Sequence, residues 1–354
     1  MKHAIRLARR GSGRVSPNPR VGAVVVKGGS IVSTGFHRNF GGPHAEADAL
    51  AGLEPSKSRG ATLYVNLEPC VHHGKTPPCT DAIIRAGIGR VVAGIVDPHP
   101  LVSGRGIEKL RKHGILVTTG VCERSCIRLN EGFIKAATRH EPFVTLKIAQ
   151  TLDGYIASGK GEPGWITGVS SRKRVHEMRR DHDAVLVGIG TVLADDPELT
   201  VRIAGGFPVK RMVLDSRLRI PLKSRLLNLP DARNTIIVTT NRASSRRIAE
   251  IKASGCQVWP VRSDSGREHL PSLCRMCVEN GIQSILVEGG SRVFSSFLRG
   301  GLADRIVCFI APRIFGRGIP AFETQGMLGI AAAPQFRETA WKRAGCDMMF
   351  EGNL

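Results

Sequence analysis

Hydrophobic and polar positions alternate along the first 137 residues in the two spacings that distinguish helices from strands. Apolar residues three and four apart indicate an amphipathic helix at Ala4–Arg10, and the apolar run Val21–Val26 indicates a strand. The turn Lys27–Ser30 joins that strand to Ile31–Gly35 as a hairpin. The pattern predicts further helices at His44–Ala51, Thr80–Ala86, Ile107–His113 and Cys122–Ala137, and further strands at Thr62–Leu67, Val91–Val96 and Ile115–Thr119. This alternation is typical of a layered α/β domain.

A second α/β series begins after the polar segment Thr138–Pro142, whose final proline favours a domain boundary. The length of 354 residues also favours two domains, because a domain usually has about 100–200 residues. We therefore expect one domain at 1–141 and another at 142–354. The strands predicted in the second domain are Phe143–Ile148, Ala184–Val187, Met212–Leu214, Ile236–Thr239, Gln257–Val261, Ile285–Val287 and Ile306–Ile310.

Composition narrows the class of protein. Hydrophobic residues make up 42% of the chain, enough for a core in each domain, yet no apolar run approaches the ~18–20 residues that span a bilayer. The first ten residues lack the apolar segment of a signal peptide. Nine cysteines, an odd number on a chain that can bury its own core, do not indicate a disulfide framework. We expect a soluble cytoplasmic protein with no membrane partner, in which some cysteines are reduced thiols or metal ligands.

The formal charge of +21 raises the question of a nucleic-acid partner. Residues 1–141 carry 21 Lys and Arg against 10 Asp and Glu, and the remainder carries 30 against 20, so neither domain is a basic tail. Aromatic residues are 5% of the chain, too few for the stacking surfaces that bind single strands. We expect no nucleic-acid partner and favour anionic small molecules as ligands.

Four residues of the first domain have the types and spacing of a catalytic zinc site. His44 and Glu46 open a predicted helix after a Gly-Gly-Pro turn, Cys70 follows a predicted strand, and Cys79 precedes the next helix. One imidazole and two thiolates suit Zn²⁺ and leave its fourth position for water. Zinc lowers the pKa of a bound water to about 7, and Glu46 can carry the released proton to a leaving nitrogen. This H-x-E and P-C pattern with a second cysteine is the signature of nucleobase deaminases.

The loop between Cys70 and Cys79 is longer than in that signature and rich in hydrogen-bond donors. Together with this loop, the strings Ser16-Pro17-Asn18-Pro19, Gly35-Phe36-His37 and Pro43-His44-Ala45-Glu46 resemble the deaminase half of the bifunctional riboflavin-biosynthesis deaminase/reductase family. The resemblance implies one zinc ion per chain, held by His44, Cys70 and Cys79, with Glu46 as the proton shuttle. It also implies that the pyrimidine or its ribose phosphate contacts Asn18, His37, His72 and Lys75. From local sequence alone, His72 and Lys75 are equally well explained as solvated loop residues.

Two other cysteine pairs do not indicate a metal site. Cys274 and Cys277 form a C-x-x-C in an apolar helical stretch, and Cys122 and Cys126 are four residues apart. Neither has a partner pair at zinc-site spacing, so we interpret both as core or helix-face thiols.

The second domain lacks the usual dinucleotide fingerprint, because no G-x-G-x-x-G lies between a strand and a helix. Glu288-Gly289-Gly290-Ser291 closes a predicted strand and opens the predicted helix Val293–Leu298. Free backbone N–H groups there favour a phosphate, although a plain glycine turn explains the local sequence equally well.

The resemblance continues through this half. The strings Lys147–Gly154, Trp165-Ile166-Thr167, Gly188–Pro197 and Leu214-Asp215-Ser216 look like the same family's reductase domain, whose fold is similar to dihydrofolate reductase. It implies NADPH as cofactor, lined by Ala149, Trp165, Thr191, Asp195, Ser216, Gly290 and Ser291. It places Arg179, Leu199, Arg202 and Glu288 toward the substrate, with Lys147 nearby. The two arginines suit a phosphate, which a guanidinium binds bidentately.

The resemblance thus predicts an N-terminal cytidine-deaminase-like α/β/α domain, a C-terminal dihydrofolate-reductase-like α/β domain and a homo-oligomer. The implied activity is deamination of 2,5-diamino-6-ribosylamino-4(3H)-pyrimidinone 5′-phosphate, then NADPH-dependent reduction of the ribosyl group to ribityl. No residue is an obvious proton donor for the second step. A nucleic-acid base deaminase with an accessory domain shares the zinc site but should lack the motifs of residues 150–202. A non-catalytic binding protein should have lost a zinc ligand or Glu46, and this chain retains them.

Overall fold

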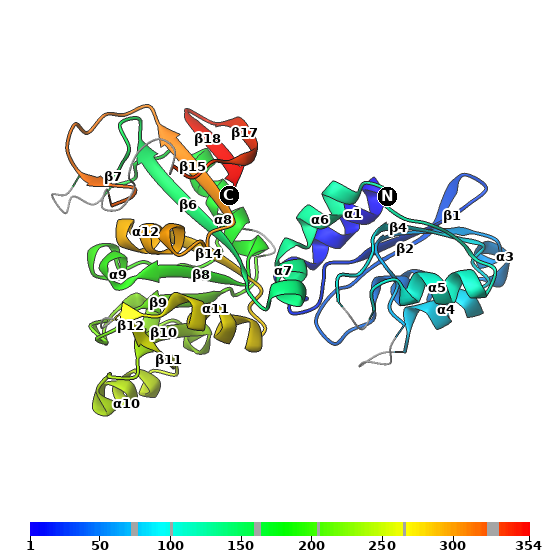
Figure 1. Cartoon of the computed structure of the whole chain (residues 1–354), viewed down its shortest axis with the longest axis horizontal. Helices are drawn as coiled ribbons and strands as arrows, with labels where there is room; N and C mark the ends of the chain where they lie inside the picture. The colour runs from blue at the N-terminus through cyan, green and yellow to red at the C-terminus, as the bar shows by residue number, and fades with distance from the viewer. Residues whose placement is uncertain (72–76, 100–101, 159–163, 204–205, 265–266, 324–332) are drawn as a thin grey trace. The chain divides into compact units, whose positions relative to one another are not determined.

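The structure is a computed structural model of the chain and describes residues 1–71, 77–99, 102–158, 164–203, 206–264, 267–323 and 333–354. The chain forms two compact units, Met1–Glu141 and Pro142–Leu354, each with its own sheet (Figure 1). Within the described ranges, no helix is both long enough and apolar enough to cross a membrane.

The first unit contains a five-stranded sheet of order β2-β1-β3-β4-β5. β1 (Gly22–Lys27) and β2 (Ser30–Phe36) form the predicted antiparallel hairpin, and both glycines of its turn have a positive φ. β3 (Thr62–Leu67) is antiparallel to β1, whereas β4 (Arg90–Ile95) and β5 (Leu116–Thr118) continue the sheet in parallel.

Helices cover both faces of this sheet, so the unit has three layers (Figure 1). α2 (Ala45–Leu50), α4 (Cys79–Arg85) and α5 (Arg105–Lys112) share one apolar core with the strands. α1 (Lys2–Ala8) and α6 (Glu123–Leu129) pack on the opposite face. The remaining elements are a 3₁₀ turn at Arg9–Gly11, α3 (Pro55–Ser58) and α7 (Glu131–Arg139).

The prediction of one helix at Cys122–Ala137 is wrong, because the chain breaks at Asn130 into α6 and α7. The Asn130 side chain binds both backbone groups of Arg20: its Oδ1 accepts from the Arg20 N–H at 2.8 Å and its Nδ2 donates to the Arg20 carbonyl at 3.0 Å. This contact spans 110 residues of sequence, so helical periodicity carries no sign of it.

The second unit contains a nine-stranded sheet of order β11-β10-β9-β8-β14-β6-β15-β18-β17. Seven strands run parallel and two antiparallel. The parallel strands are β6 (Phe143–Thr151), β8 (Ala184–Gly188), β9 (Lys210–Leu214), β10 (Thr235–Thr240), β11 (Gln257–Val261), β14 (Ser284–Gly289) and β15 (Arg305–Ala311). Their carboxyl ends therefore lie along one edge of the sheet.

The two antiparallel strands, β17 (Arg337–Ala344) and β18 (Asp347–Asn353), were not predicted. β17 is an edge strand with mostly exposed side chains, so its sequence lacks the apolar alternation of a half-buried strand. The helices of this unit are α8 (Val169–Asp181), α9 (Ile189–Asp195), α10 (Ser245–Ala253), α11 (Leu270–Glu279) and α12 (Ser291–Arg299). Short ladders pair β7 (Tyr155–Ala157) with β16 (Ile319–Pro320) and β12 (Ser263–Asp264) with β13 (Arg267–Glu268), and 3₁₀ turns lie at Arg225–Leu227 and Ala232–Asn234.

Candidate active sites

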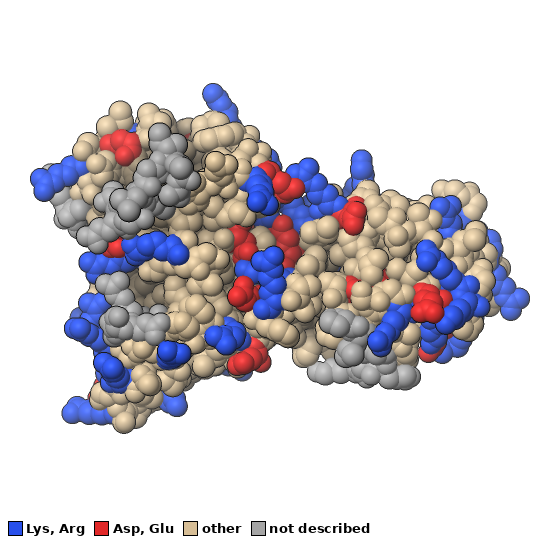
Figure 2. Space-filling view, in the orientation of Figure 1, with Lys and Arg blue, Asp and Glu red and all other residues tan. Residues whose placement is uncertain are grey.

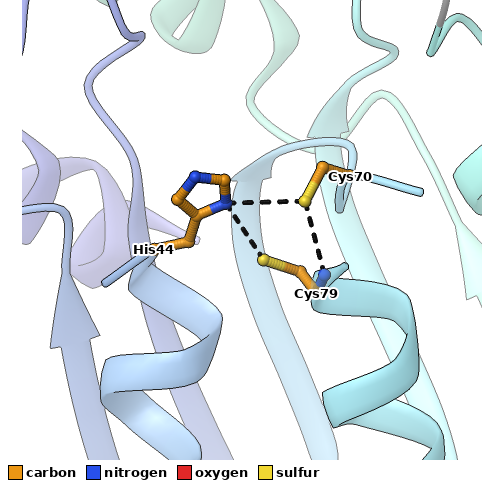
Figure 3. Close-up of side chains that lie close together, drawn as sticks. All are labelled: His44, Cys70 and Cys79. Atoms are coloured by element: carbon orange, nitrogen blue, oxygen red, sulfur yellow. Dashed lines mark hydrogen bonds between the residues drawn. The ribbon is translucent and has the colours of Figure 1, made fainter. Parts of the chain in front are cut away.

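Three candidate metal ligands converge in the first unit (Figure 3). His44 is the N-cap of α2, Cys70 follows β3, and Cys79 is the first residue of α4. The His44 Nδ1 lies 3.2 Å from the Cys79 Sγ and 3.5 Å from the Cys70 Sγ. The structure therefore brings together all three residues that the sequence analysis selected.

The spacing of these atoms fits zinc. Zinc–sulfur bonds of about 2.3 Å and zinc–nitrogen bonds of about 2.0 Å at tetrahedral angles place neighbouring ligand atoms roughly 3.5 Å apart. All three ligand atoms lie within 4.8 Å of one another. The Cys79 backbone N–H also donates to the Cys70 sulfur at 3.3 Å. A hydrogen bond with the Cys79 side chain is the main reason that the pKa of Cys70 falls to about 4, and the His44 side chain and the Cys79 backbone N–H lower it further. Three protein ligands leave one position open, as in catalytic zinc sites.

Glu46 lies in the first turn of α2, two residues after His44, and only 3% of its surface is exposed. Burial raises the pKa of Glu46 to about 7, and the charge of Cys70 adds to the effect. A carboxyl group with a pKa near neutrality can both accept and release a proton.

His37 and Asn18 stand beside the metal ligands. The His37 ring meets the His44 ring edge to face, with centroids 5.5 Å apart. His37 Nδ1 donates to the Pro43 carbonyl at 2.9 Å, so its Nε2 is the acceptor for the Asn18 amide at 3.1 Å. Burial lowers the pKa of His37, which stays neutral at pH 7. This pair can therefore present a fixed polar surface to a bound ring.

Glu68 is a residue that the sequence analysis did not select. It is 3% exposed, and its carboxylate accepts four backbone N–H groups, those of Asp97, Gly104, Gly106 and Ile107, at 2.9–3.1 Å. It lies two positions before Cys70. Glu68 therefore connects the loop that carries Cys70 to the start of α5. Its partners Gly104, Gly106 and Ile107 lie 36 to 39 residues further along the chain.

Two substrate residues predicted for this unit, His72 and Lys75, lie outside the described residues. All nine cysteines are free thiols. Cys126, Cys274 and Cys277 are buried in hydrophobic clusters, and Cys122 packs half-buried against one, in agreement with the interpretation of both pairs as core or helix-face thiols.

The second unit holds a buried ionic cluster at the carboxyl end of β14. The Arg179 guanidinium binds Glu288 bidentately, with Nε–Oε1 and Nη2–Oε2 distances of 2.5 and 2.9 Å. Lys147 Nζ lies 3.2 Å from the Glu288 Oε2. Burial by itself raises the pKa of Glu288, but the charges of Arg179 and then Lys147 lower it to about 2. Three predicted substrate residues are thus neighbours, and the carboxylate is ionised at any working pH.

The segment 199–202 lies against this cluster. Arg179 Nη1 donates to the Thr200 carbonyl at 2.9 Å, which holds the predicted residues Leu199 and Arg202 beside α8. Leu199 is buried with a φ of 52°, an unusual conformation for a non-glycine residue. A second contact, from His176 to the Arg202 backbone, was missed by the sequence analysis.

Predicted cofactor residues lie at the carboxyl ends of neighbouring parallel strands. Thr191 lies in the first turn of α9 after β8, Gly290 and Ser291 open α12 after β14, and Ser216 follows β9. A Cβ atom on Gly289 would lie 3.2 Å from the Thr191 Oγ1, so a glycine keeps this space open. The buried Ser291 Oγ has no hydrogen-bond partner among the described residues. A free hydroxyl and backbone N–H groups at a helix start fit a cofactor phosphate.

The remaining cofactor residues are more dispersed. Ala149 lies in β6, opposite Phe309 of β15. Trp165 is 66% exposed, under the Arg172 guanidinium. Asp195 is the last residue of α9 and is exposed.

Basic and acidic side chains are interspersed on the face of the molecule drawn in Figure 2. Figure 2 shows Lys and Arg side chains scattered over the visible face of both units, with Asp and Glu among them. Several are in surface ion pairs, such as Lys112 with Glu108 and Arg246 with Glu250.

Comparisons with known proteins agree with this division of chemistry. The family model of the cytidine and deoxycytidylate deaminase zinc-binding region matches residues 1–95, and that of the RibD C-terminal domain matches residues 142–350. The riboflavin biosynthesis protein RibD of Aquifex aeolicus is 46% identical, over 99% of this chain and 96% of its own length. The RibD of Escherichia coli K12 is 37% identical, over 98% and 96%.

Solved structures are similar over the whole chain. Acinetobacter baumannii RibD has a TM-score of 0.89 and 35% identity, covering 99% of this chain and 97% of its own. A Thermotoga maritima diaminohydroxyphosphoribosylaminopyrimidine deaminase/5-amino-6-(5-phosphoribosylamino)uracil reductase has a TM-score of 0.88 and 43% identity, covering 100% and 97%. The predicted fold classes, a cytidine-deaminase-like and a dihydrofolate-reductase-like domain, are confirmed.

Proposed function

The chain belongs to the RibD family of bifunctional riboflavin-biosynthesis deaminase/reductases, and from this premise we propose which of its residues perform each reaction. The observation that carries the proposal is the convergence of His44, Cys70 and Cys79 beside the buried Glu46. We assign deamination of 2,5-diamino-6-ribosylamino-4(3H)-pyrimidinone 5′-phosphate to residues 1–141 and reduction of its ribosyl group to residues 142–354.

In the first unit, His44, Cys70 and Cys79 would hold the zinc ion, which when bound supplies an activated water. Glu46 takes a proton at its carboxylate and delivers it to the departing amine, a role suited to a buried carboxyl with a pKa of about 7. Asn18 and His37 orient the pyrimidine, because their mutual hydrogen bond and the Pro43 carbonyl hold both side chains in place. His72 and Lys75 complete the predicted contacts.

In the second unit, Thr191, Gly290 and Ser291 would hold the phosphates of NADPH, which when bound supplies a hydride for the sugar. Ala149, Trp165, Asp195 and Ser216 would line the rest of the cofactor. The Arg202 side chain is 58% exposed, and its Nη1 lies 3.9 Å from the Glu198 carboxylate, so most of the guanidinium is open to a substrate phosphate. Arg179, Glu288, Lys147 and Leu199 form the wall behind the sugar.

We further propose that the chain works in the cytoplasm as a homo-oligomer, as the family resemblance implies. Nine free thiols and dependence on NADPH suit a reducing compartment. The dispersed charge supports a small anionic substrate rather than a polynucleotide.

The proposal is tested by anaerobic turnover of the pyrimidinone phosphate with Glu46→Gln, measuring ammonia release and NADPH absorbance. The variant should release no ammonia and consume no NADPH, because the proton carrier is gone. It should consume NADPH at the wild-type rate when the deaminated intermediate is supplied. Asp48→Asn, in the same helix turn, is the control and should retain both activities.

Two results would contradict the assignment. If Glu46→Gln still releases ammonia, Glu46 is not the proton carrier. If the wild-type chain releases ammonia but consumes no NADPH, the reductase assignment fails. Deamination of a single-stranded RNA or DNA in place of the pyrimidinone phosphate would favour a nucleic-acid deaminase.

A further inference from the structure

His176 lies on α8 three residues before Arg179, so both side chains project from the same face of the helix. The His176 Nδ1 lies 3.2 Å from the backbone N of Arg202. Arg179 Nη1 donates to the Thr200 carbonyl at 2.9 Å. Two side chains on one face of α8 therefore bind backbone groups of the segment 200–202 that lie two residues apart.

The backbone conformation just before this segment has to be stabilised by surrounding contacts. It follows Leu199, whose φ of 52° is unfavourable for a β-carbon-bearing residue and persists only where surrounding contacts impose it. The Arg202 side chain is 58% exposed, and its nearest carboxylate, Glu198, is 3.9 Å away. Few contacts therefore fix the Arg202 side chain, and the position of its guanidinium depends on where the Arg202 backbone is held.

We propose that His176 is a positioning residue of the reductase site: its neutral imidazole binds the Arg202 N–H and so places the Arg202 guanidinium for the substrate's phosphate. The inference rests on the proposed function of Arg202. Its consequence falls on substrate binding, because His176 makes no described hydrogen bond with the residues proposed to line the cofactor.

The interaction requires the neutral ring. An N–H donor points at Nδ1, so Nδ1 must be unprotonated, and a protonated imidazole cannot accept this bond. The charged groups that face His176 are Arg179 on its own helix, Arg202 on the loop and Glu288 on β14. Burial, followed by the charges of Arg179 and Arg202, lowers the pKa of His176, so the ring is neutral at pH 7 and the contact is lost only in more acidic solution.

The test compares His176→Leu and His176→Asn in the full-length chain, with Lys173→Leu on the exposed side of α8 as control. The deaminated intermediate is the substrate, so the reductase is measured alone. His176→Leu should raise the KM for this substrate roughly five- to ten-fold, the effect of one lost hydrogen bond, with kcat and the KM for NADPH nearly unchanged. His176→Asn retains an acceptor near the Nδ1 position and should restore a near-normal KM.

The pH profile separates positioning from a structural role. The wild-type KM should rise as the pH falls through the lowered pKa of His176, and by more than titration of the substrate phosphate explains. His176→Asn cannot titrate and should show only the phosphate's contribution.

The proposal is overturned if His176→Leu leaves the KM unchanged, or if wild type and His176→Asn have the same pH profile. It is also overturned if His176→Leu lowers kcat and weakens NADPH binding in parallel, since that indicates general damage to the unit. Deaminase activity in the same chain monitors folding of the other unit. A wild-type chain that does not oxidise NADPH at all would instead refute the proposed function, which separates the two failures.

Discussion

Glu68 shows how a single carboxylate supports the zinc site without touching the metal ligands in any described hydrogen bond. Its two oxygens accept four backbone N–H groups that precede or begin α5. Gly106 passes so close to the Pro69 carbonyl that a Cβ atom at this position would clash with it. The loop that carries Cys70 is therefore packed directly on the loop before α5.

Glu68→Gln should loosen this contact. An amide can accept with only one of its two ends, so two buried N–H groups lose their partner, at a cost of about 1–3 kcal/mol in the free energy of unfolding of the first unit. We also expect faster zinc loss to a chelator. Both are measured by denaturant unfolding and by metal release. Glu108→Gln, whose exposed carboxylate pairs only with Lys112 among the described contacts, should behave like wild type. Equal zinc release from the two variants would show that the hydrogen bonds of Glu68 do not support the loop that carries Cys70.

At the scale of elements, the deaminase site depends on how closely α2 packs on β2. Gly35 of β2 faces the backbone of α2, and a Cβ atom there would clash with main-chain atoms of Ala45 and Ala49. Because His44 and Glu46 belong to the first turn of this helix, the distance between strand and helix sets their position relative to Cys70.

Gly35→Ala should therefore displace α2 and impair deamination. Overpacking of this kind costs about 1–3 kcal/mol of stability, and the displaced His44 should bind zinc more weakly. Bound zinc and ammonia release measure the effect. Thr34→Ala, at the exposed neighbouring position of β2, is the control and should keep its zinc. A fully active, zinc-loaded Gly35→Ala chain would show that α2 tolerates the shift.

Two of the elements that the pattern failed to predict depend on contacts between distant segments. α6 and α7 separate because Asn130 binds the backbone of Arg20, and β18 pairs with the edge of β15 and in turn with β17. The Arg20–Asn130 and β15–β18 partners are distant in sequence, whereas hydrophobic periodicity reports only which face of a local segment is buried.

At the scale of the whole molecule, each of the two units has its own hydrophobic core. Each hydrophobic cluster among the described residues draws its members from Met1–Glu141 or from Pro142–Leu354, and none mixes the two. The charge is likewise shared between them rather than concentrated in one. The units should therefore be independent in stability.

A protease site inserted between Glu141 and Pro142 tests this independence. After cleavage of the folded protein, the 1–141 fragment should retain deamination and the 142–354 fragment should retain reduction, since each keeps its own core. Ammonia and NADPH assays on the separated fragments measure the outcome, with the uncleaved insertion variant as control. If the proposed homo-oligomer forms through the second unit, light scattering should find it in the 142–354 fragment. Loss of either activity on separation would mean that the units depend on one another.

Residue types and short spacings were enough to predict the chemistry: the kinds of zinc ligand, the acidic residue two positions after the first ligand, and the family to which both halves belong. Such short patterns place side chains in the same way at any helix start or strand end, so they can be recognised without the fold. The contacts that hold this chemistry in place became visible only in the folded chain. Glu68, His176 and Asn130 each act on backbone groups 26 or more residues away, and such pairs are set by strand order and packing rather than by local pattern.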